Sequence, residues 1–223
     1  GHGYSGIPKV ESTPGFFADC VSGFLEQLGL EQVVIVGESI GGTLPLRLAA
    51  EHHQRVKKVV AINPYDYDGG RGVLRSSVVA RLLFGMNNIP VLGATNWRLR
   101  ALPAFTAVMR GGVHRPDAIP PALLREMNAV GNRPGHYRAF MSLIRHFPEW
   151  DKELSDYGAI GVPVLFIYGD HDWSHPEERA ASVERVPGAV SHEVRDAGHF
   201  LSLDAPEDAV REILGFARTD VQS

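Results

Sequence analysis

Cysteine is almost missing from this chain of 223 residues, in which Cys20 is the single representative. One thiol excludes an intrachain disulfide, and so low a cysteine content favours a reducing compartment, so we expect a cytoplasmic protein. Cys20 falls within a helix expected to begin at Thr13-Pro14, where threonine caps the helix and proline opens it. We therefore predict that Cys20 is a buried structural thiol and not a nucleophile.

Long apolar runs are also missing, since none approaches the ~20 residues that a membrane-spanning helix requires. The formal net charge of -4 gives no general attraction to nucleic acid, and 44% hydrophobic residues argue against disorder. The chain begins Gly1-His2-Gly3-Tyr4, with neither an initiator Met nor the features of a signal peptide. We interpret it as a piece of a longer polypeptide.

Apolar, β-branched runs alternate with segments of helical periodicity. The run Gln32 to Gly37 is typical of a strand buried on both faces. Strands separated by helices predict an α/β fold with a mainly parallel sheet and right-handed crossovers. The expected strands are 32–37, 56–62, 162–168 and 191–194. The expected helices begin at Pro14, where Phe17, Val21, Phe24 and Leu28 share a face, and then cover 40–52, 177–186 and 206–217.

Residues 68–150 break this alternation. They contain three helical segments, 78–84, 122–130 and 137–147, but no convincing strand. An insertion of roughly eighty residues is too long for an ordinary loop. We therefore predict a helical cap at 68–150 over a core made of residues 1–67 and 151–223.

The cap contains eleven arginines and no lysine against four acidic residues, so the remainder of the chain is acidic. One interpretation is that a basic cap docks on an acidic core. The other is that the arginines meet an anionic substrate or a membrane surface. We favour docking because arginine is common at interfaces.

The segment Gly37-Glu38-Ser39-Ile40-Gly41 follows a buried strand and opens a helix. This is the context of a G-x-S-x-G nucleophile elbow, in which small flanking residues, Gly37 and Gly41, allow a tight turn that exposes the serine Oγ. The N–H of Ile40 would point toward a developing oxyanion. The simpler alternative is a glycine-rich turn with Ser39 as a helix cap.

A nucleophilic serine needs a base, and the base needs an orienting acid. His199 lies in a small-residue turn after the last expected strand, and Asp172 follows the preceding strand, which gives the chain order serine, acid, histidine. Asp170 is the alternative acid, which would otherwise cap the turn. A surface-loop histidine is the alternative for His199.

Metal chemistry is a weaker interpretation of the same region. His171 and His175 are four residues apart and flank Asp172, but Pro176 interrupts a continuous helix through them. No third set of ligands stands out. We therefore expect no metal and no cofactor.

Four motifs, in this order, resemble those of the α/β-hydrolase fold superfamily. Residues 1–6 resemble the turn after its fourth strand, 37–42 its elbow, 169–172 its acid loop and 198–200 its base loop. The resemblance implies a serine hydrolase that cleaves an ester, thioester or related acyl bond of a small to medium apolar substrate through an acyl-enzyme. Serine at the elbow, in place of aspartate, argues against the epoxide-hydrolase and haloalkane-dehalogenase branches.

The resemblance leaves other functions open. Carbon–carbon bond hydrolases and cofactor-free haloperoxidases have a similar triad, and a non-catalytic binding module of the same fold is a further alternative. In this family the second oxyanion donor comes from a loop that precedes the G-H-G turn, which implies an upstream segment supplied in cis or in trans. The expected partner is a small acyl substrate, and no oligomeric state is indicated. The cap is expected to line an apolar pocket with Leu82, Leu83, Phe84, Trp97, Leu99 and Phe105.

Overall fold

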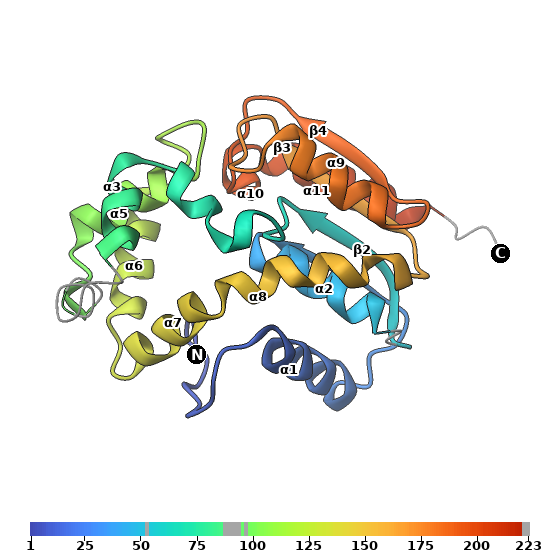
Figure 1. Cartoon of the computed structure of the whole chain (residues 1–223), viewed down its shortest axis with the longest axis horizontal. Coiled ribbons are helices and arrows are strands. Elements are labelled where there is room, and N and C mark those ends of the chain that lie inside the picture. The colour runs from blue at the N-terminus through green and yellow to red at the C-terminus, as the bar shows by residue number, and fades with distance from the viewer. Residues whose placement is uncertain (52–53, 87–94, 96–97, 220–223) are drawn as a thin grey trace.

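Four apolar segments pair into one parallel sheet (Figure 1). The computed structural model describes residues 1–51, 54–86, 95 and 98–219. The strands are β1 (Val33–Glu38), β2 (Val56–Ile62), β3 (Val164–Gly169) and β4 (Val190–Val194), in the order β1-β2-β3-β4. Every neighbouring pair is parallel, which confirms the predicted α/β class.

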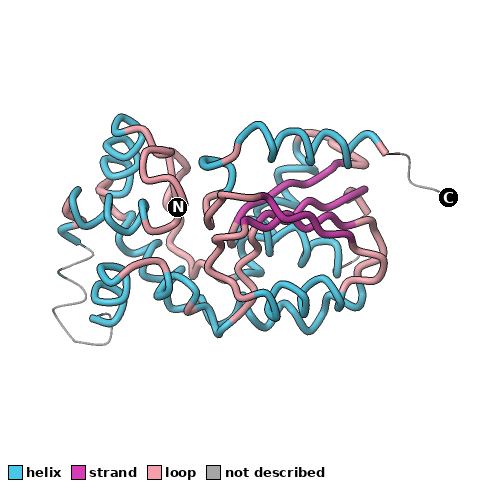
Figure 2. The backbone as a smooth tube through the Cα atoms, turned by 90° about the horizontal axis from the view of Figure 1, so that it is seen from above, coloured by secondary structure: helices cyan, strands magenta, loops and turns pink. Residues whose placement is uncertain are grey.

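Helices cover both faces of the sheet, as Figure 2 shows. Successive residues of a strand point to opposite faces. Val59 and Phe166 therefore pack with one cluster and Val60 and Ile167 with the other, and all four are buried. The first face carries α1 (Pro14–Gln27), α2 (Ile40–Ala50) and α9 (Pro176–Arg185). The second carries α10 (Leu201–Asp204) and α11 (Pro206–Arg218).

The strand β1 lies at an edge of the described sheet, so the prediction of burial on both faces is wrong for it. Its residues are half-buried, and Val36 is 41% exposed. On the adjacent α1, Phe24 and Leu28 are exposed as well, although Thr13 caps the helix as predicted. Cys20, four residues before Phe24 and hence on the same helix face, is exposed and not buried. No described element covers this face of α1, which is why the expectation fails.

Within 68–150 the described residues form only helices and loops, which Figure 1 shows grouped beside the sheet. The prediction of one helix over 137–147 is wrong at its end. The helix stops at Arg145, and a new one starts so that Pro148 falls in its first turn, where no N–H is required. The elements are η1 (Asp68–Gly70), η2 (Gly72–Arg75), α3 (Val78–Gly85), α5 (Leu102–Arg110), α6 (Pro121–Gly131), α7 (His136–Arg145) and α8 (Phe147–Lys152). The 3-10 helix η4 (Glu153–Ala159) then leads back to β3.

Several arginines of this segment hold it to the rest of the chain. Arg75 pairs with Glu178 of α9 at 2.7 Å, and Arg145 pairs with Glu11 at 3.1 Å. Other arginines bind backbone carbonyl oxygens outside the segment: Arg138 that of Pro8, Arg133 that of Gly3, and Arg115 that of Asp204. These contacts agree with the docking interpretation. In the described part of the chain, no helix is long and apolar enough to cross a membrane.

Candidate active site

Ser39 occupies a strained turn between β1 and α2. Its backbone has φ 59° and ψ -127°, a conformation that a residue with a side chain adopts only when its surroundings impose it. The Ser39 N–H donates to the Ile62 carbonyl oxygen at 2.9 Å, and the Ser39 carbonyl accepts from Gly42 N–H at 2.8 Å. The strain is thus held by the adjacent strand and by the first turn of the helix.

The elbow closes on the backbone at Gly37. A Cβ atom built there would lie 1.6 Å from the carbonyl oxygen of Gly41, which no rearrangement of a side chain could relieve. At Gly41 itself, nothing described lies within 4 Å of such a Cβ, so the predicted need for a small residue there is wrong. Gly42 takes that role, because its Cβ would lie 3.0 Å from the Ile62 carbonyl oxygen.

The structure brings Ser39, His199 and Asp172 together. Ser39 Oγ lies 2.8 Å from His199 Nε2, and His199 Nδ1 lies 2.5 Å from Asp172 Oδ1. The side chains of His199 and Asp172 are both inaccessible to solvent. The three groups form one hydrogen-bonded line from hydroxyl to imidazole to carboxylate.

Asp172 is a buried carboxylate with several donors. Burial by itself raises its pKa, but His199 and the hydroxyl and N–H of Ser174 outweigh this effect, so its pKa lies below the ordinary value. Arg179 in turn donates from Nε to Ser174 Oγ at 3.0 Å. The geometry therefore favours an ionised acid facing the imidazole.

Asp170, the alternative acid, lies elsewhere in the turn. Its Oδ1 accepts a hydrogen bond from Ala197 N–H at 3.2 Å, and its side chain is 28% exposed. The carboxylate that forms a hydrogen bond with His199 is that of Asp172. Asp170 therefore caps the turn and joins the acid loop to the base loop.

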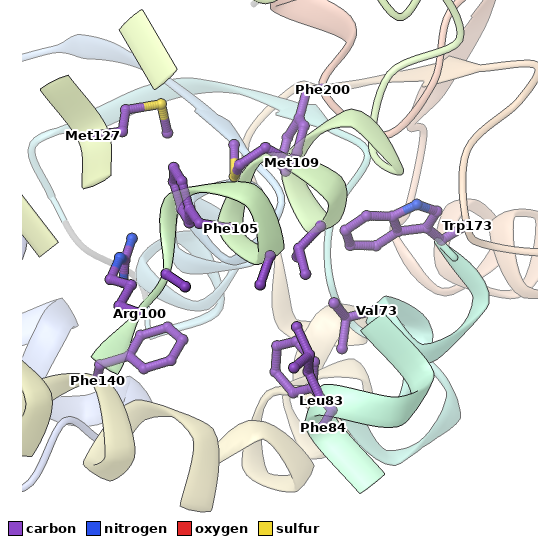
Figure 3. Close-up of a pocket in the computed structure, with 13 residues that line it drawn as sticks. Val73, Leu83, Phe84, Arg100, Phe105, Met109, Met127, Phe140, Trp173 and Phe200 are labelled. Atoms are coloured by element: carbon purple, nitrogen blue, oxygen red, sulfur yellow. The ribbon is translucent and has the colours of Figure 1, made fainter. Parts of the chain in front are cut away.

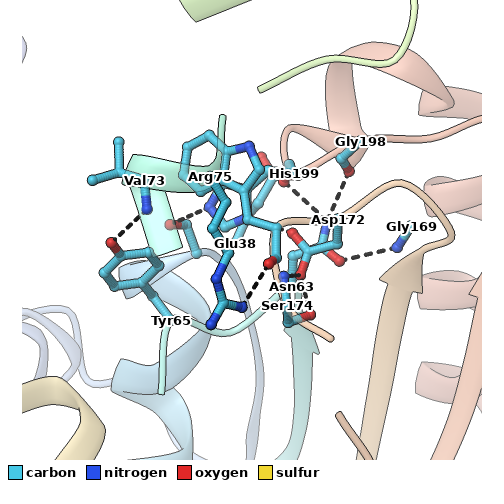
Figure 4. A network of polar contacts seen from close by, with 12 residues as sticks. Glu38, Asn63, Tyr65, Val73, Arg75, Gly169, Asp172, Ser174, Gly198 and His199 are labelled. Atoms are coloured by element: carbon cyan, nitrogen blue, oxygen red, sulfur yellow. Dashed lines mark hydrogen bonds and ion pairs between the residues drawn. The ribbon is translucent and has the colours of Figure 1, made fainter. Parts of the chain in front are cut away.

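Asn63 was not identified from the sequence. It follows β2 directly, is fully buried, and donates from its side-chain amide to the carbonyl oxygens of Gly198 at 3.0 Å and His199 at 2.9 Å. Its Oδ1 accepts from Gly169 N–H at 3.0 Å, so one side chain ties the base loop to the acid loop (Figure 4). An asparagine at the carboxyl end of a buried strand was the only signal available.

Glu38 and Asp204 hold the same loops from other sides. Glu38, next to the serine, accepts from both the N–H and the hydroxyl of Ser202, at 2.9 and 2.7 Å. Asp204 accepts from Gly198 N–H at 2.8 Å and from His114 N–H at 2.7 Å. The elbow, the base loop and the segment around His114 are thereby linked.

Ile40 is the first residue of α2. The initial N–H groups of a helix have no partner inside it, and they lie at the positive end of the helix dipole. The position agrees with the predicted oxyanion donor.

Comparison with known proteins shows the family to which the chain belongs. The alpha/beta hydrolase fold family model matches residues 1–206. The chain belongs to this family. Carboxylesterase YbfK from Bacillus subtilis (strain 168) is 27% identical over 216 residues, which cover 94% of this chain. The chain spans 66% of the length of that carboxylesterase, slightly under two thirds.

Solved structures of other proteins have the same fold. The enol-lactonase from Burkholderia xenovorans LB400 has a TM-score of 0.76 and 21% identity, over 98% of this chain and 78% of its own. The bromoperoxidase from Bacillus anthracis has a TM-score of 0.77 and 22% identity, over 98% of this chain and 79% of its own. At this level of identity the likeness concerns the fold alone.

Aromatic rings enclose the histidine of this hydrolase-fold chain. The Trp173 ring stacks on the His199 ring with centroids 3.8 Å apart and planes 9° apart. Phe200 and Tyr65 meet the same imidazole edge-on, at 5.5 and 6.0 Å. These rings keep water from the imidazole and fix its orientation, which strengthens its interaction with Asp172.

An apolar cavity of about 220 Å³ opens beside these rings (Figure 3). Leu83, Phe84 and Phe105 line it as predicted, whereas Leu82 and Leu99 are 63% and 71% exposed and do not. Trp97 lies outside the described residues. The remaining lining residues are Val73, Arg100, Ala101, Ala104, Val108, Met109, Met127, Phe140, Trp173 and Phe200.

His171, Asp172 and His175, the residues considered for metal binding, do not form a ligand cluster in the structure. Asp172 is engaged by His199, so the set of His171, Asp172 and His175 does not form. Among the described residues a different set, His114, His171 and Asp196, has donor atoms within 4.8 Å of one another. All three are on the surface, and the rings of the two histidines are stacked with their centroids 3.9 Å apart.

Proposed function

We propose that this chain is a serine hydrolase that cleaves an ester, thioester or related acyl bond through an acyl-enzyme. The observation that carries the proposal is the line from Ser39 Oγ to His199 Nε2 and from His199 Nδ1 to Asp172, at 2.8 and 2.5 Å. The likeness to a carboxylesterase and to an enol-lactonase supports the choice of acyl substrates.

The proposed reaction begins when Ser39 Oγ attacks the carbonyl carbon and His199 Nε2 takes the hydroxyl proton. Asp172 holds the imidazole in the required tautomer and stabilises the imidazolium. The Ile40 N–H donates to the oxyanion of the tetrahedral intermediate. As the intermediate collapses, His199 gives its proton to the leaving group, and Ser39 remains acylated. A water molecule, deprotonated by His199, then attacks the acyl-enzyme and releases the acid and Ser39.

We assign the substrate's apolar part to the cavity beside His199. Trp173 and Phe200 contact the imidazole and also line the cavity, so a bound chain would extend from the reacting carbonyl into the helices of 68–150. These helices would then act as a cap over a core of 1–67 and 151–223. Burial of about 0.8 kcal/mol per methylene favours medium acyl chains over acetyl. We expect kcat/KM to rise with acyl length.

A haloperoxidase-like activity, or cleavage of a carbon–carbon bond, is the second candidate. The fold shared with a bromoperoxidase supports the first of these reactions, and the fold shared with a meta-cleavage product hydrolase supports the second. A substrate screen that includes p-nitrophenyl esters, monochlorodimedone with peroxide and bromide, and a vinylogous diketone separates these reactions.

The direct experiment is labelling with a fluorophosphonate probe together with hydrolysis of p-nitrophenyl butyrate. The parent should be labelled at Ser39 and hydrolyse the ester, and Ser39→Ala should do neither. Ser191→Ala, in the exposed part of β4, is the matched control and should behave as the parent. Hydrolysis at the parental rate in Ser39→Ala would refute the proposal, and a folded parent without labelling or turnover would favour a binding module.

A further inference from the structure

Arg100 is the one charged side chain among the described residues that line the cavity beside His199. In Figure 3 it lies with Phe140 at one end of the lining, and Trp173 lies at the opposite end. Trp173 stacks on His199, so one end of the cavity is lined by a ring in contact with the imidazole and the other by a guanidinium. The side chains between them are aliphatic, aromatic or methionine.

The surroundings of Arg100 are apolar. Its guanidinium carbon lies 4.4 Å from the ring centre of Phe105 and 5.7 Å from that of Phe140. Its Nε is buried without a hydrogen-bond partner in the described part of the chain. Burial lowers the pKa of this guanidinium, and no described carboxylate offsets that effect.

No described carboxylate forms an ion pair with Arg100. Glu126 lines the adjoining cavity together with Arg100, but the partner of its Oε1 is the Tyr4 hydroxyl, which donates to it at 2.9 Å. The undescribed cap residues, 87–94 and 96–97, include no aspartate or glutamate. Arg100 thereby differs from Arg75 and Arg145, which are paired with carboxylates.

The guanidinium is held in a close-fitting position. A Cβ atom at Gly131 of α6 would lie 2.3 Å from the Arg100 Cζ, so this glycine leaves the space that the guanidinium fills. Two aromatic faces complete the support. An arginine fixed in this way presents a planar fork of donors, whose geometry matches a carboxylate, and it loses little further freedom on binding one.

We propose that Arg100 binds a carboxylate at the far end of the acyl chain, so that the preferred substrates are half-esters of medium-length dicarboxylic acids. The reasoning is energetic: a partly desolvated charge without a partner is costly, and an anionic ligand group removes that cost. The apolar middle of the cavity would bind the methylenes. This assignment rests on the proposed serine hydrolase function, since it places the ester carbonyl at Ser39.

The test compares two esters of equal chain length, p-nitrophenyl hexanoate and mono-p-nitrophenyl adipate, which differ only in a terminal methyl or carboxylate. The parent should have the higher kcat/KM on the adipate ester. Arg100→Met should lower this value by about 10- to 100-fold, as expected for a charge-assisted hydrogen-bonded pair, and should affect the hexanoate ester far less. Arg81→Met, an exposed arginine of α3, is the control and should change neither value. Gly131→Ala should impair the adipate ester selectively, because it displaces the guanidinium.

A binding measurement separates this inference from the proposed function. In the Ser39→Ala variant, free adipate should raise the melting temperature more than hexanoate does, and Arg100→Met should abolish that difference. This result would support the carboxylate site even if no ester were hydrolysed. Equal loss of both esters in Arg100→Met, or no preference for adipate in either turnover or melting temperature, would overturn the inference while leaving the serine hydrolase assignment intact.

Discussion

The side-chain amide of Asn63 donates a hydrogen bond to the backbone carbonyl oxygen of His199 over 2.9 Å. The same amide reaches the carbonyl of Gly198 and accepts from the N–H of Gly169. Two carbonyl acceptors and one N–H donor, all buried, require a group that both donates twice and accepts once, and a primary amide provides this. Asn63 therefore positions His199 and the loop that carries Asp172.

Asn63→Asp should lower kcat more than it alters KM, because a carboxylate would repel the two carbonyls and shift the imidazole. Buried groups that lose their partners cost about 1–3 kcal/mol each, so the free energy of unfolding should fall as well. Asn132→Asp at the exposed C-terminal end of α6 is the control for kcat. Steady-state kinetics and urea denaturation measure both effects, and a parental kcat in Asn63→Asp would contradict the positioning role.

Asp172→Asn should cost far more activity than Asp170→Asn. An amide at position 172 favours the wrong imidazole tautomer, and such a change lowers kcat by about 10⁴ in a comparable triad. Asp170 makes no contact with His199 and accepts from Ala197 N–H, and an amide oxygen can still accept there, so Asp170→Asn should keep activity within about tenfold of the parent. The two variants are compared by kcat on one ester. The reverse ranking would mean that the acid is misassigned.

The sheet could be predicted because β3 is apolar along its length and β2 is apolar except at Lys57 and Lys58, a composition typical of strands buried on both faces. The same reasoning failed for β1 and for Cys20. Their local sequence is equally apolar, but their exposure depends on which elements lie beside them. The local sequence pattern does not predict these neighbours. Burial of a face is a tertiary property, whereas the periodicity that creates the face is local.

The positions of Ser39, His199 and Asp172 could be predicted because each occupies a characteristic turn after a strand. Asn63 and Arg100 could not. Asn63 is 136 residues from its partner His199, and no local motif marks the pairing. Arg100 is one of eleven arginines in a basic segment, and it is set apart by its burial without a described acidic partner, which a residue pattern does not show.

Gly37→Ala should prevent folding, whereas Gly41→Ala should be tolerated. At position 37 the new methyl group would overlap the Gly41 carbonyl oxygen at 1.6 Å, and at position 41 it would meet no described atom within 4 Å. Alanine within a helix is favoured over glycine by about 0.5–1 kcal/mol, so Gly41→Ala should unfold at an equal or higher temperature than the parent. Soluble yield and thermal melting measure the contrast. A well-folded Gly37→Ala protein would show that the elbow is looser than its geometry indicates.

Asp66 is a buried carboxyl group whose protonation should set part of the pH dependence of stability. It is 1% exposed and accepts hydrogen bonds from the hydroxyls of Tyr157 at 2.8 Å and Ser182 at 3.2 Å. Burial raises its pKa to about 7, despite these donors. An aspartate in the unfolded chain has a pKa of about 3.9.

Between these two values the folded state holds a proton that the unfolded state has lost, so stability should fall as the pH rises and should level off above pH 7. Each pH unit below the folded pKa changes the free energy of unfolding by about 1.4 kcal/mol, so the parent should lose about 2–3 kcal/mol of stability between pH 5 and pH 8. The asparagine of Asp66→Asn does not titrate, so this contribution to the pH dependence is absent in the variant. Its free energy of unfolding relative to the parent should therefore increase by that amount over the same interval, as measured by urea denaturation. Asp156→Asn, an exposed carboxylate of η4, is the control and should show no such change. A pH-independent difference between Asp66→Asn and the parent would mean that Asp66 is ionised in the folded protein.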